Sequence, residues 1–411
     1  MSETQYVRAR HATKITGHPI LKSIAFSAIA VVSFGTVFAQ TFVDKIEARI
    51  TTENIDPLLG PDRPEIVVNP EDGAAGRALN IVLMGSDDRS GENAAIGGVE
   101  QGKRNDTTII MHVSADRQRV ELVSIPRDTM VQIENCERSD GTSQRGWHAE
   151  FNVAFANGAA NGNNADGAAC TVKTIEALTN VYIDHFAVID FVGFRDMVNA
   201  VNGVPMCIPV EYADAYSGTY LSPGPQVLNG DQAISYVRMR KGKNVTGSDL
   251  DRIDRQQEFL KNLARKVLSA EMLYRPQEVT NFIKAVADSL TVDEKLGDVN
   301  YLGGLAFSLR HLDPGNGIVM ATAPVETYPA DHNRVQFSRK APAIWEALRN
   351  DQPIAPLLDQ QSASPANEVG VSDSTAGGST DAGGANGEGG SSSVDIDQHS
   401  EQAILDACPA A

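Results

Sequence analysis

The stretch RNDTTIIMHVSADRQRVELVSIPRDT, residues 104–129, contains the pattern that decides the fold. Within it, DTTIIMHV (106–113) and RVELVSI (119–125) are rich in β-branched residues, and a polar turn at Ala115–Gln118 separates them. Two such runs around a short turn predict a β-hairpin. The earlier run ALNIVLMG (78–85) is apolar and ends in glycine, which is typical of a buried strand. These segments therefore predict the centre of a β-sheet.

Strand and helix patterns alternate after the hairpin. Further strands are expected at HFAVIDF (185–191), VPMCIPV (204–210) and GIVMATAPV (317–325). Helices are expected at 152–157, 171–179, 192–201, 231–239, 250–270, 277–289, 297–311 and 341–349. The alternation predicts an α/β protein, with helices over a central sheet that the hairpin makes mixed.

An uncharged apolar run, IAFSAIAVVSFGTVFAQTFV (24–43), is long enough to span a bilayer as a helix. Arg8, Arg10, Lys14 and Lys22 precede it with only Glu3 opposing, so the positive-inside rule places residues 1–23 in the cytoplasm and the remainder outside. A cleaved signal peptide with a site near Ala39 is the alternative. Both interpretations export the main domain, and the uncleaved anchor is favoured because the apolar run continues past that site.

The flanking segments differ in composition from the central part. Residues 44–77 are polar and contain four prolines, which is typical of a linker. A single large domain is expected over 78–351. Residues 352–411 are rich in Ser, Gly, Ala and Asp, so they are expected to be disordered. The final QAILDACPAA (402–411) is either a docking segment or a frayed end.

The formal net charge is −18, and no Lys or Arg occurs from Asp351 onward. This balance argues against nucleic-acid binding, since phosphate backbones recruit basic surface. Four cysteines are present, and three complete pairings are possible among them. In an oxidising compartment, a bridge between Cys136 and Cys170 is favoured because these residues flank a loop-rich insert. The alternative is that all four are reduced, with Cys207 as a small apolar strand residue.

Acidic residues lie where two of the expected strands meet the same edge of the sheet. GSDDRSG (85–91) follows one strand, and KRND (103–106) precedes the next. If the strands pair, Asp87 and Asp106 meet at one sheet end, and two carboxylates there would suit Mg²⁺ or Mn²⁺. Each segment also fits an ordinary polar turn.

Basic residues follow the hairpin and recur later. In SIPRD (124–128), Pro126 ends the strand and places Arg127 at its edge, where it either grips a phosphate or pairs with Asp128 or another neighbouring acid. YVRMRKGK (236–243) and DLDRIDRQQ (249–257) form a basic cluster in an acidic protein, which favours a polyanion pocket over a solvated face. Its basic members are Arg238, Arg240, Lys241, Lys243, Arg252 and Arg255.

The sequence contains no GxSxG, HExxH, GxxxxGK[ST] or CxxC motif. Arginines with carboxylates for a metal, and no evident covalent nucleophile, indicate phosphoryl transfer by positioning and charge stabilisation.

Taken in order, these motifs resemble those of the LytR-CpsA-Psr family of cell-wall enzymes, in their actinobacterial form. The resemblance rests on NIVLMGSDDR (80–89), 104–129, FNVAFANGAA (151–160), 171–209 and LNGDQAISYVRMR (228–240) with 249–257. It implies a three-layer α/β/α sandwich behind one N-terminal transmembrane helix, with an apolar cavity for a polyprenyl tail. The sequence departs from the family pattern in a longer connection (94–103) and an expanded segment (136–169).

The resemblance also implies a function and roles for named residues. The activity would be transfer of a polyprenyl-diphosphate-linked glycopolymer onto peptidoglycan through a phosphodiester bond, at the outer face of the cell membrane and in contact with its lipid. Asp87 and Asp106 would hold the metal, while Arg89, Arg127, Arg238 and Arg240 would bind the diphosphate. Asp87, Arg127, Arg238 and Arg240 would form the catalytic set, and Arg252, Arg255 and Gln256 would line or brace the pocket.

Two other functions remain open at the level of sequence. One is a polyprenyl-diphosphate phosphatase, in which water replaces the acceptor hydroxyl in the same pocket. The other is a non-catalytic lipid-phosphate-binding or regulatory envelope protein. Retention of Asp87, Arg127, Arg238 and Arg240 favours the catalytic alternatives, because a pseudo-enzyme would be expected to lose some of them.

Overall fold

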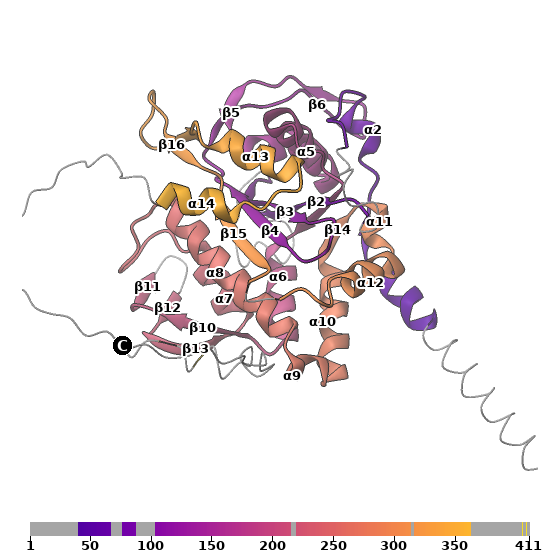
Figure 1. Ribbon diagram of the computed structural model, residues 1–411, viewed down its shortest axis with the longest axis vertical. Helices are drawn as coiled ribbons and strands as arrows, with labels where there is room; N and C mark the ends of the chain where they lie inside the picture. Colours follow the sequence, from indigo (N-terminus) through magenta and orange to yellow (C-terminus); the bar gives the residue numbers. More distant parts are fainter. Residues whose placement is uncertain are drawn as a thin grey trace, which may run out of the picture. The chain divides into compact units, whose positions relative to one another are not determined.

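The computed structural model describes residues 40–66, 76–87, 103–214, 219–313 and 316–362, together with Leu405 and Cys408. The chain divides into two compact units, Met1–Ala48 and Arg49–Ala411. In the first unit, residues 40–47 are helical. The second unit contains the strands and helices described below (Figure 1).

A mixed seven-stranded sheet forms the centre of the second unit. Its order is β1-β14-β9-β2-β3-β4-β15, with parallel pairs β1/β14, β9/β2 and β4/β15 and antiparallel pairs elsewhere. In the same order the strands are Thr51–Thr52, Leu290–Val292, His185–Ile189, Leu79–Ser86, Asn105–Val113, Val120–Ile125 and Ile318–Thr322. The predicted α/β class with a central mixed sheet is thereby confirmed.

The register of the three central strands decides where the polar clusters meet. Ser86 at the end of β2 pairs with Asn105 at the start of β3, after a register shift at Gly85. Ile125 at the end of β4 pairs with Thr108 of β3. The segments after β2, before β3 and after β4 therefore lie at one end of the sheet.

Helices pack on both faces of the sheet (Figure 1). One face carries the largest apolar cluster, which includes Val82, Met84, Ile110, Phe155 and Trp345. Its helices are α2 (Asp56–Leu59), α4 (Val153–Gly158), α5 (Asn164–Thr179), α13 (Ala341–Arg349) and α14 (Ala355–Ser362). The other face packs against α8 (Asp249–Val267), α11 (Glu294–Gly297) and α12 (Val299–Ser308).

A separate apolar cluster lies beside the sheet and joins helices to a small hairpin. The predicted strand at 204–210 is present as β10 (Val204–Ile208), but it pairs with β13 (Gly224–Leu228) rather than with the central sheet. The helices here are α6 (Phe191–Ala200), α7 (Gly230–Arg238), α9 (Ala270–Leu273) and α10 (Pro276–Ser289).

The remaining short strands form two-stranded antiparallel pairs. The paired strands are β5 (Met130–Gln132) with β8 (His148–Glu150), β6 (Cys136–Glu137) with β7 (Ser143–Gln144), β11 (Tyr212–Asp214) with β12 (Thr219–Leu221), and β16 (Val325–Thr327) with β17 (Val335–Phe337). A 3₁₀ turn, η1, covers Ala159–Asn161.

Two disulfides join segments that are distant in the sequence. Cys136 and Cys170 connect β6 to α5, and both residues are buried. A second bridge, which the sequence did not predict, joins Cys207 of β10 to Cys408 with a Cα–Cα distance of 5.4 Å. The segment 402–411 is therefore attached to the folded unit at Cys408.

Several boundaries differ from the sequence-based expectations. Helix α5 begins at Asn164, seven residues before the segment expected to be helical, because Asn163 caps it with a hydrogen bond to the Ala165 amide. The elements β1 and α2 lie within the expected linker, and α14 follows the expected domain end at Asp351.

No helix among the described residues is long and apolar enough to cross a membrane. The expected span at 24–43 lies outside the described residues except for its last four positions, 40–43.

Candidate active site

A tight turn after β4 directs Arg127 toward the start of β3. The Thr129 amide and hydroxyl both donate to the Pro126 carbonyl, at 3.1 and 2.6 Å, which fixes the turn that carries Arg127. The Asn152 amide donates to the Arg127 carbonyl at 3.1 Å. The guanidinium of Arg127 then donates to Asp106 Oδ1 at 2.5 Å. The ion pair that the sequence left as an alternative for Arg127 is therefore present.

Arg127 is also close to two further carboxylates. Its Nε lies 3.4 Å from Asp249 and 3.5 Å from Asp128. Because the Arg127 side chain is only 15% exposed, three acids surround one largely buried cation. Sequence analysis identified Arg127 and Asp106 and named Asp128 as an alternative partner of Arg127, but it did not identify Asp249.

The first turn of α8 contributes a second arginine to this cluster. Ser248 caps the helix by accepting from the Leu250 amide at 3.2 Å. Arg252, three residues after Asp249, pairs with that acid at 2.6 Å and donates to the Asp106 carbonyl at 3.1 Å. Gln257 fixes the helix to the sheet through hydrogen bonds to Ser124 and Thr322. Arg252 therefore lies under Asp106 on a helix held against β4 and β15.

The end of α7 carries the other two arginines of the predicted set. Arg240 lies 4.0 Å from Asp128 and is partly exposed. The guanidinium carbon of Arg238 lies 4.2 Å from the centroid of the Phe191 ring, in a cation–π arrangement. Arg240 thus belongs to the acid–arginine cluster through Asp128, while Phe191 positions Arg238.

Arg255 and Gln256 brace α7. Arg255 donates to the carbonyls of Tyr236 and Met239, and Gln256 donates to that of Val237 at 3.1 Å. These are carbonyls at the helix C-terminus, where a positive charge is favourable. Both side chains are buried, so the contacts support the end of α7 that presents Arg238 and Arg240.

The two carboxylates expected to hold a metal lie at the same end of the sheet. The Asp87 amide donates to the Arg104 carbonyl at 2.7 Å, which places Asp87 beside the start of β3. The Asn105 side chain hydrogen-bonds to the Thr107 amide and the Thr108 hydroxyl, which fixes the start of β3 that carries Asp106. No group of three or more His, Cys, Asp or Glu within the described part of the chain is arranged to hold a metal. Arg89 lies outside the described residues.

The cluster shifts the pKa values of its two outer acids in opposite directions. Burial alone would raise the pKa of Asp106, but the charges of Arg127 and Arg252 outweigh it and lower the value. Burial raises the pKa of Asp128, and the nearby Asp249 charge adds to this against Arg127 and Arg334. Asp106 is thus held as a carboxylate, while Asp128 is the acid most ready to take up a proton.

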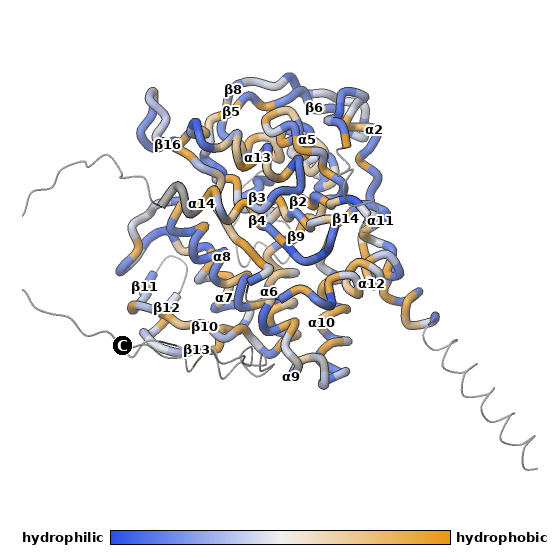
Figure 2. Tube along the Cα trace, viewed as in Figure 1, coloured by the Kyte–Doolittle hydropathy of each residue, from blue (hydrophilic) through white to orange (hydrophobic). Residues whose placement is uncertain are grey.

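Apolar side chains that are only partly buried lie between the sheet and the helices α8 and α12. They are Leu83, Met111, Leu260, Leu305, Leu309 and Met320. Helix α12 is predominantly hydrophobic (Figure 2), yet none of its residues is buried and Phe307 is 66% exposed. An apolar surface therefore adjoins the arginine cluster.

A further arginine, Arg334 from the loop between β16 and β17, reaches the cluster from outside. Its Nη1 lies 3.5 Å from Asp128, and it also pairs with Glu150 and Asp331. The main chain supports this position, since the Val335 amide donates to the Asp128 carbonyl at 3.4 Å. The segment 325–338 contains no pattern that would have marked Arg334 as part of the site.

The fold and this sheet end define an α/β protein with an arginine–carboxylate cluster beside an apolar surface. This chain belongs to the LytR_cpsA_psr family, whose model matches residues 43–340. The predicted family is thereby confirmed.

Relatives within the family are moderately similar. The cell wall biosynthesis protein LcpA of Corynebacterium glutamicum is 29% identical over 335 residues, covering 77% of this chain and 62% of that protein. A polyisoprenyl-teichoic acid–peptidoglycan teichoic acid transferase, TagU of Enterococcus faecalis, is 32% identical over 222 residues, covering 54% of this chain and 63% of that protein. The chain thus spans less than two thirds of the length of these relatives.

Among solved structures, protein gbs0355 from Streptococcus agalactiae superposes with a TM-score of 0.52 at 22% identity. The match covers 67% of this chain and 89% of that chain. This likeness shows a shared fold.

Proposed function

We propose that this protein is a phosphotransferase that moves a polyprenyl-diphosphate-linked glycopolymer onto peptidoglycan during cell-wall biogenesis. The observation that carries the proposal is the cluster of Arg127, Arg240 and Arg252 at one sheet end, paired with Asp106, Asp128 and Asp249. Transferases of this type among the family's members support the same assignment. The expected N-terminal span would hold the protein in the cell membrane, with this domain outside.

Binding would use two adjoining surfaces of the site. The partly buried apolar side chains between the sheet and α12 suit a polyprenyl tail. Arg127, Arg238 and Arg240, with Arg89, would bind the diphosphate, because a guanidinium stays charged and matches phosphate oxygens in pairs. In the absence of substrate, carboxylates neutralise Arg127 and Arg240, and a diphosphate would replace part of that neutralisation.

In the reaction, an acceptor hydroxyl oxygen attacks the phosphorus that bears the glycan. The bond between this phosphorus and the bridging oxygen breaks, lipid phosphate leaves, and a phosphodiester joins glycan to acceptor. The hydroxyl proton passes to Asp128, whose pKa is raised by burial and by Asp249. Arg127 stabilises the charge that develops on the phosphoryl oxygens.

The residues present fit a magnesium or manganese ion held by Asp87 and Asp106. Two carboxylates at one sheet end, with water and phosphate oxygens as the other ligands, match the ordinary magnesium environment. Asp106 engages Arg127 through Oδ1, whereas its Oδ2 lies 3.9 Å from Arg252. When bound, the ion would neutralise diphosphate charge.

The test uses the full-length protein in detergent with a polyprenyl-diphosphate oligosaccharide, peptidoglycan fragments and Mg²⁺. Wild type is expected to form a phosphodiester-linked glycan, detected by mass spectrometry. Arg127→Ala should lower kcat/KM by roughly 10²–10³-fold, the usual loss when one charge-stabilising donor is removed. Arg127→Lys should retain only part of the wild-type kcat/KM, because lysine keeps the charge but not the paired donors.

Arg275→Ala serves as the matched control, because Arg275 is exposed and pairs with Glu271 and Glu278, away from the cluster and from α12. A melting-temperature measurement accompanies each variant, since Arg127→Ala leaves three acids around an empty position. Release of lipid phosphate without linked glycan would identify a phosphatase instead. Lipid binding without turnover in the wild type would identify a binding protein.

A further inference from the structure

A pocket of about 330 Å³ lies outside the arginine cluster, and its lining includes Arg334, which pairs with Asp128. Its floor comes from β5 and β8, which pair through Met130 and Glu150. Its wall comes from the loop between β16 and β17, through Tyr328, Asp331 and Arg334. The volume is at the low end of the range for small-ligand sites, and corresponds to one or two sugar rings rather than a polymer.

The loop that forms the wall has a defined conformation. The Tyr328 amide donates to the Arg334 carbonyl at 2.9 Å, and the Arg334 amide donates to Asp331 at 2.9 Å. A parallel bridge between Thr129 and Val335 joins the loop's end to the strand segment that follows Arg127. The pocket is therefore built on the same backbone that positions the reactive arginine.

Three carboxylates already surround the cation of the pocket. Arg334 pairs with Asp128, Glu150 and Asp331, so acidic groups outnumber basic ones here. A phosphate or a carboxylate would be repelled by this surplus of negative charge. A hydroxyl group can donate a hydrogen bond to the carboxylates of the pocket and accept one from the Arg334 guanidinium, so it suits both kinds of polar group there.

Aromatic side chains supply an apolar surface beside these polar groups. The rings of His148 and Tyr328 lie 5.9 Å apart at an interplanar angle of 32°. Aromatic faces pack against the C–H face of a sugar ring while its rim of hydroxyls meets polar groups.

From these features we propose that this pocket binds an uncharged sugar ring of the acceptor glycan. The assignment rests on the proposed function, and it names the acceptor side of the same site. Asp128 connects the two parts, since its Oδ1 lies 3.5 Å from both Arg127 and Arg334. A glycan held here presents its hydroxyls toward the carboxylate assigned to take up the proton.

Binding to the pocket is measured by isothermal titration calorimetry, because neither tryptophan of the chain lines the pocket. The full-length protein in detergent is titrated with chitotetraose, a neutral N-acetylglucosamine oligomer, and separately with a synthetic stem pentapeptide. The variants are Tyr328→Ala and, as a matched control, Tyr274→Ala, whose side chain is exposed outside the pocket.

Chitotetraose is expected to give a saturable binding isotherm with the wild type and with Tyr274→Ala. Tyr328→Ala should weaken this binding by about tenfold, the loss expected for one stacked aromatic ring with its buried area. In the transfer assay, the same variant should raise KM for the acceptor and leave KM for the lipid donor in place.

Equal affinity in Tyr328→Ala and the wild type, or no saturable binding of chitotetraose, would overturn the assignment. Saturable binding of the pentapeptide alone would assign the pocket to the stem peptide and also reject the glycan. If chitotetraose binds through Tyr328 but the wild type transfers nothing, the glycan pocket stands while its acceptor role and the proposed function fail. Transfer that is insensitive to Tyr328→Ala would retain the function and reject the pocket.

Discussion

At the scale of single residues, Asp128 is balanced between charges of opposite sign. Burial and the charge of Asp249 raise its pKa, while the charges of Arg127, Arg334 and Arg252 lower it. Arg240 lies 4.0 Å from the same carboxylate. A proton acceptor works only when ionised, so transfer should decline as the pH falls through the raised pKa of Asp128. The acid limb of the rate profile therefore reports on this residue.

Arg334→Gln is predicted to move that acid limb to higher pH. Removing a nearby cation disfavours the ionised form, so the pKa of Asp128 rises further. The measurement is kcat/KM for transfer against pH, with Arg275→Gln as the matched control. A limb that stays in place, or moves to lower pH, would show that another group accepts the proton.

At the scale of elements, the cluster depends on three elements whose ends meet at one place. β4 ends at Pro126 and carries Arg127, α8 begins with Asp249 and Arg252, and α7 ends with Arg238. The strand patterns and the helix caps that set these ends are local features, so sequence analysis located each of them to within a few residues. The hydrogen bonds from Arg255 to the end of α7 could not be foreseen, because they link two helices.

The Cys136–Cys170 bridge joins β6 to α5, which underlies the turn near the site. The bridge spans 34 residues. Replacing both cysteines by alanine is predicted to lower the free energy of unfolding by about 3–4 kcal/mol on the chain-entropy model. Urea unfolding measures this loss, and hydrogen exchange in α5 should rise. Cys207→Ala with Cys408→Ala is the control, since it leaves α5 bridged; equal exchange in both double variants would contradict the prediction.

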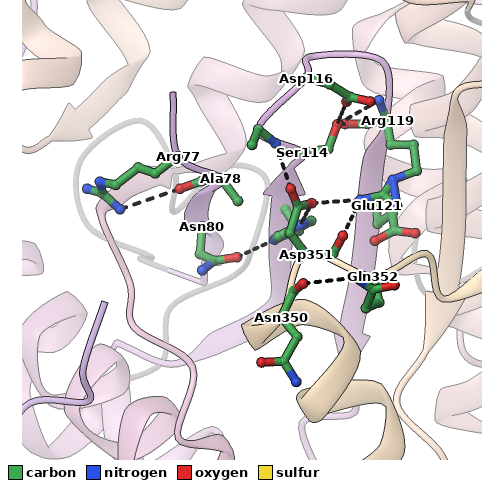
Figure 3. A network of polar contacts seen from close by, with 12 residues as sticks. Arg77, Ala78, Asn80, Ser114, Asp116, Arg119, Glu121, Asn350, Asp351 and Gln352 are labelled. Carbon is green, nitrogen blue, oxygen red and sulfur yellow. Dashed lines mark hydrogen bonds and ion pairs between the residues drawn. The ribbon is translucent and has the colours of Figure 1, made fainter. Parts of the chain in front are cut away.

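At the scale of the whole folded unit, a buried polar network fixes the C-terminal segment to the sheet end opposite the site. Figure 3 shows Asp351 facing Arg119 and Ser114, with Asn80 close by. Asp351 accepts hydrogen bonds from His112 at 3.0 Å, from the Ala115 amide at 2.9 Å and from Arg119 at 2.6 Å. These contacts connect residues more than 230 positions apart in the chain.

Burial would raise the pKa of Asp351, but the hydrogen bonds from His112 and Ala115 and the charge of Arg119 outweigh it and lower the value. A lowered carboxyl pKa contributes stability above the unfolded value, near pH 4, and loses it as the pH falls through the folded value. Asp351→Asn should therefore lower the free energy of unfolding at pH 7 by about 1.5–3 kcal/mol. The difference from the wild type should shrink as the pH falls below about 4, and it should vanish once the pH is below the lowered pKa of Asp351 in the folded protein.

Urea unfolding of both proteins between pH 3 and 7 measures this effect. Asn tolerates the positive φ of 53° at this position as well as Asp does, so backbone strain does not enter the comparison. A stability difference that is as large at pH 3 as at pH 7 would mean that the carboxylate charge is not the source of the stabilisation.

The sequence by itself determined the elements and the chemistry of their ends. Apolar runs of β-branched residues are local signals, and they identified β2, β3 and β4 with the polar residues that follow or precede them. The order of five motifs also determined the family. What the sequence could not determine is which side chains from distant segments meet, because no local pattern encodes a contact across a hundred residues or more.

Only the tertiary structure placed Asp249 beside Arg127, brought Arg334 to Asp128 and joined Cys207 to Cys408. It also removed β10 from the central sheet, although its apolar strand pattern resembles that of β9. The physical reason is the same in each case. Hydrophobic burial is non-directional and fixes how much of a segment is inside, whereas strand pairing and ion pairing depend on which partners the folded chain brings within a few ångströms.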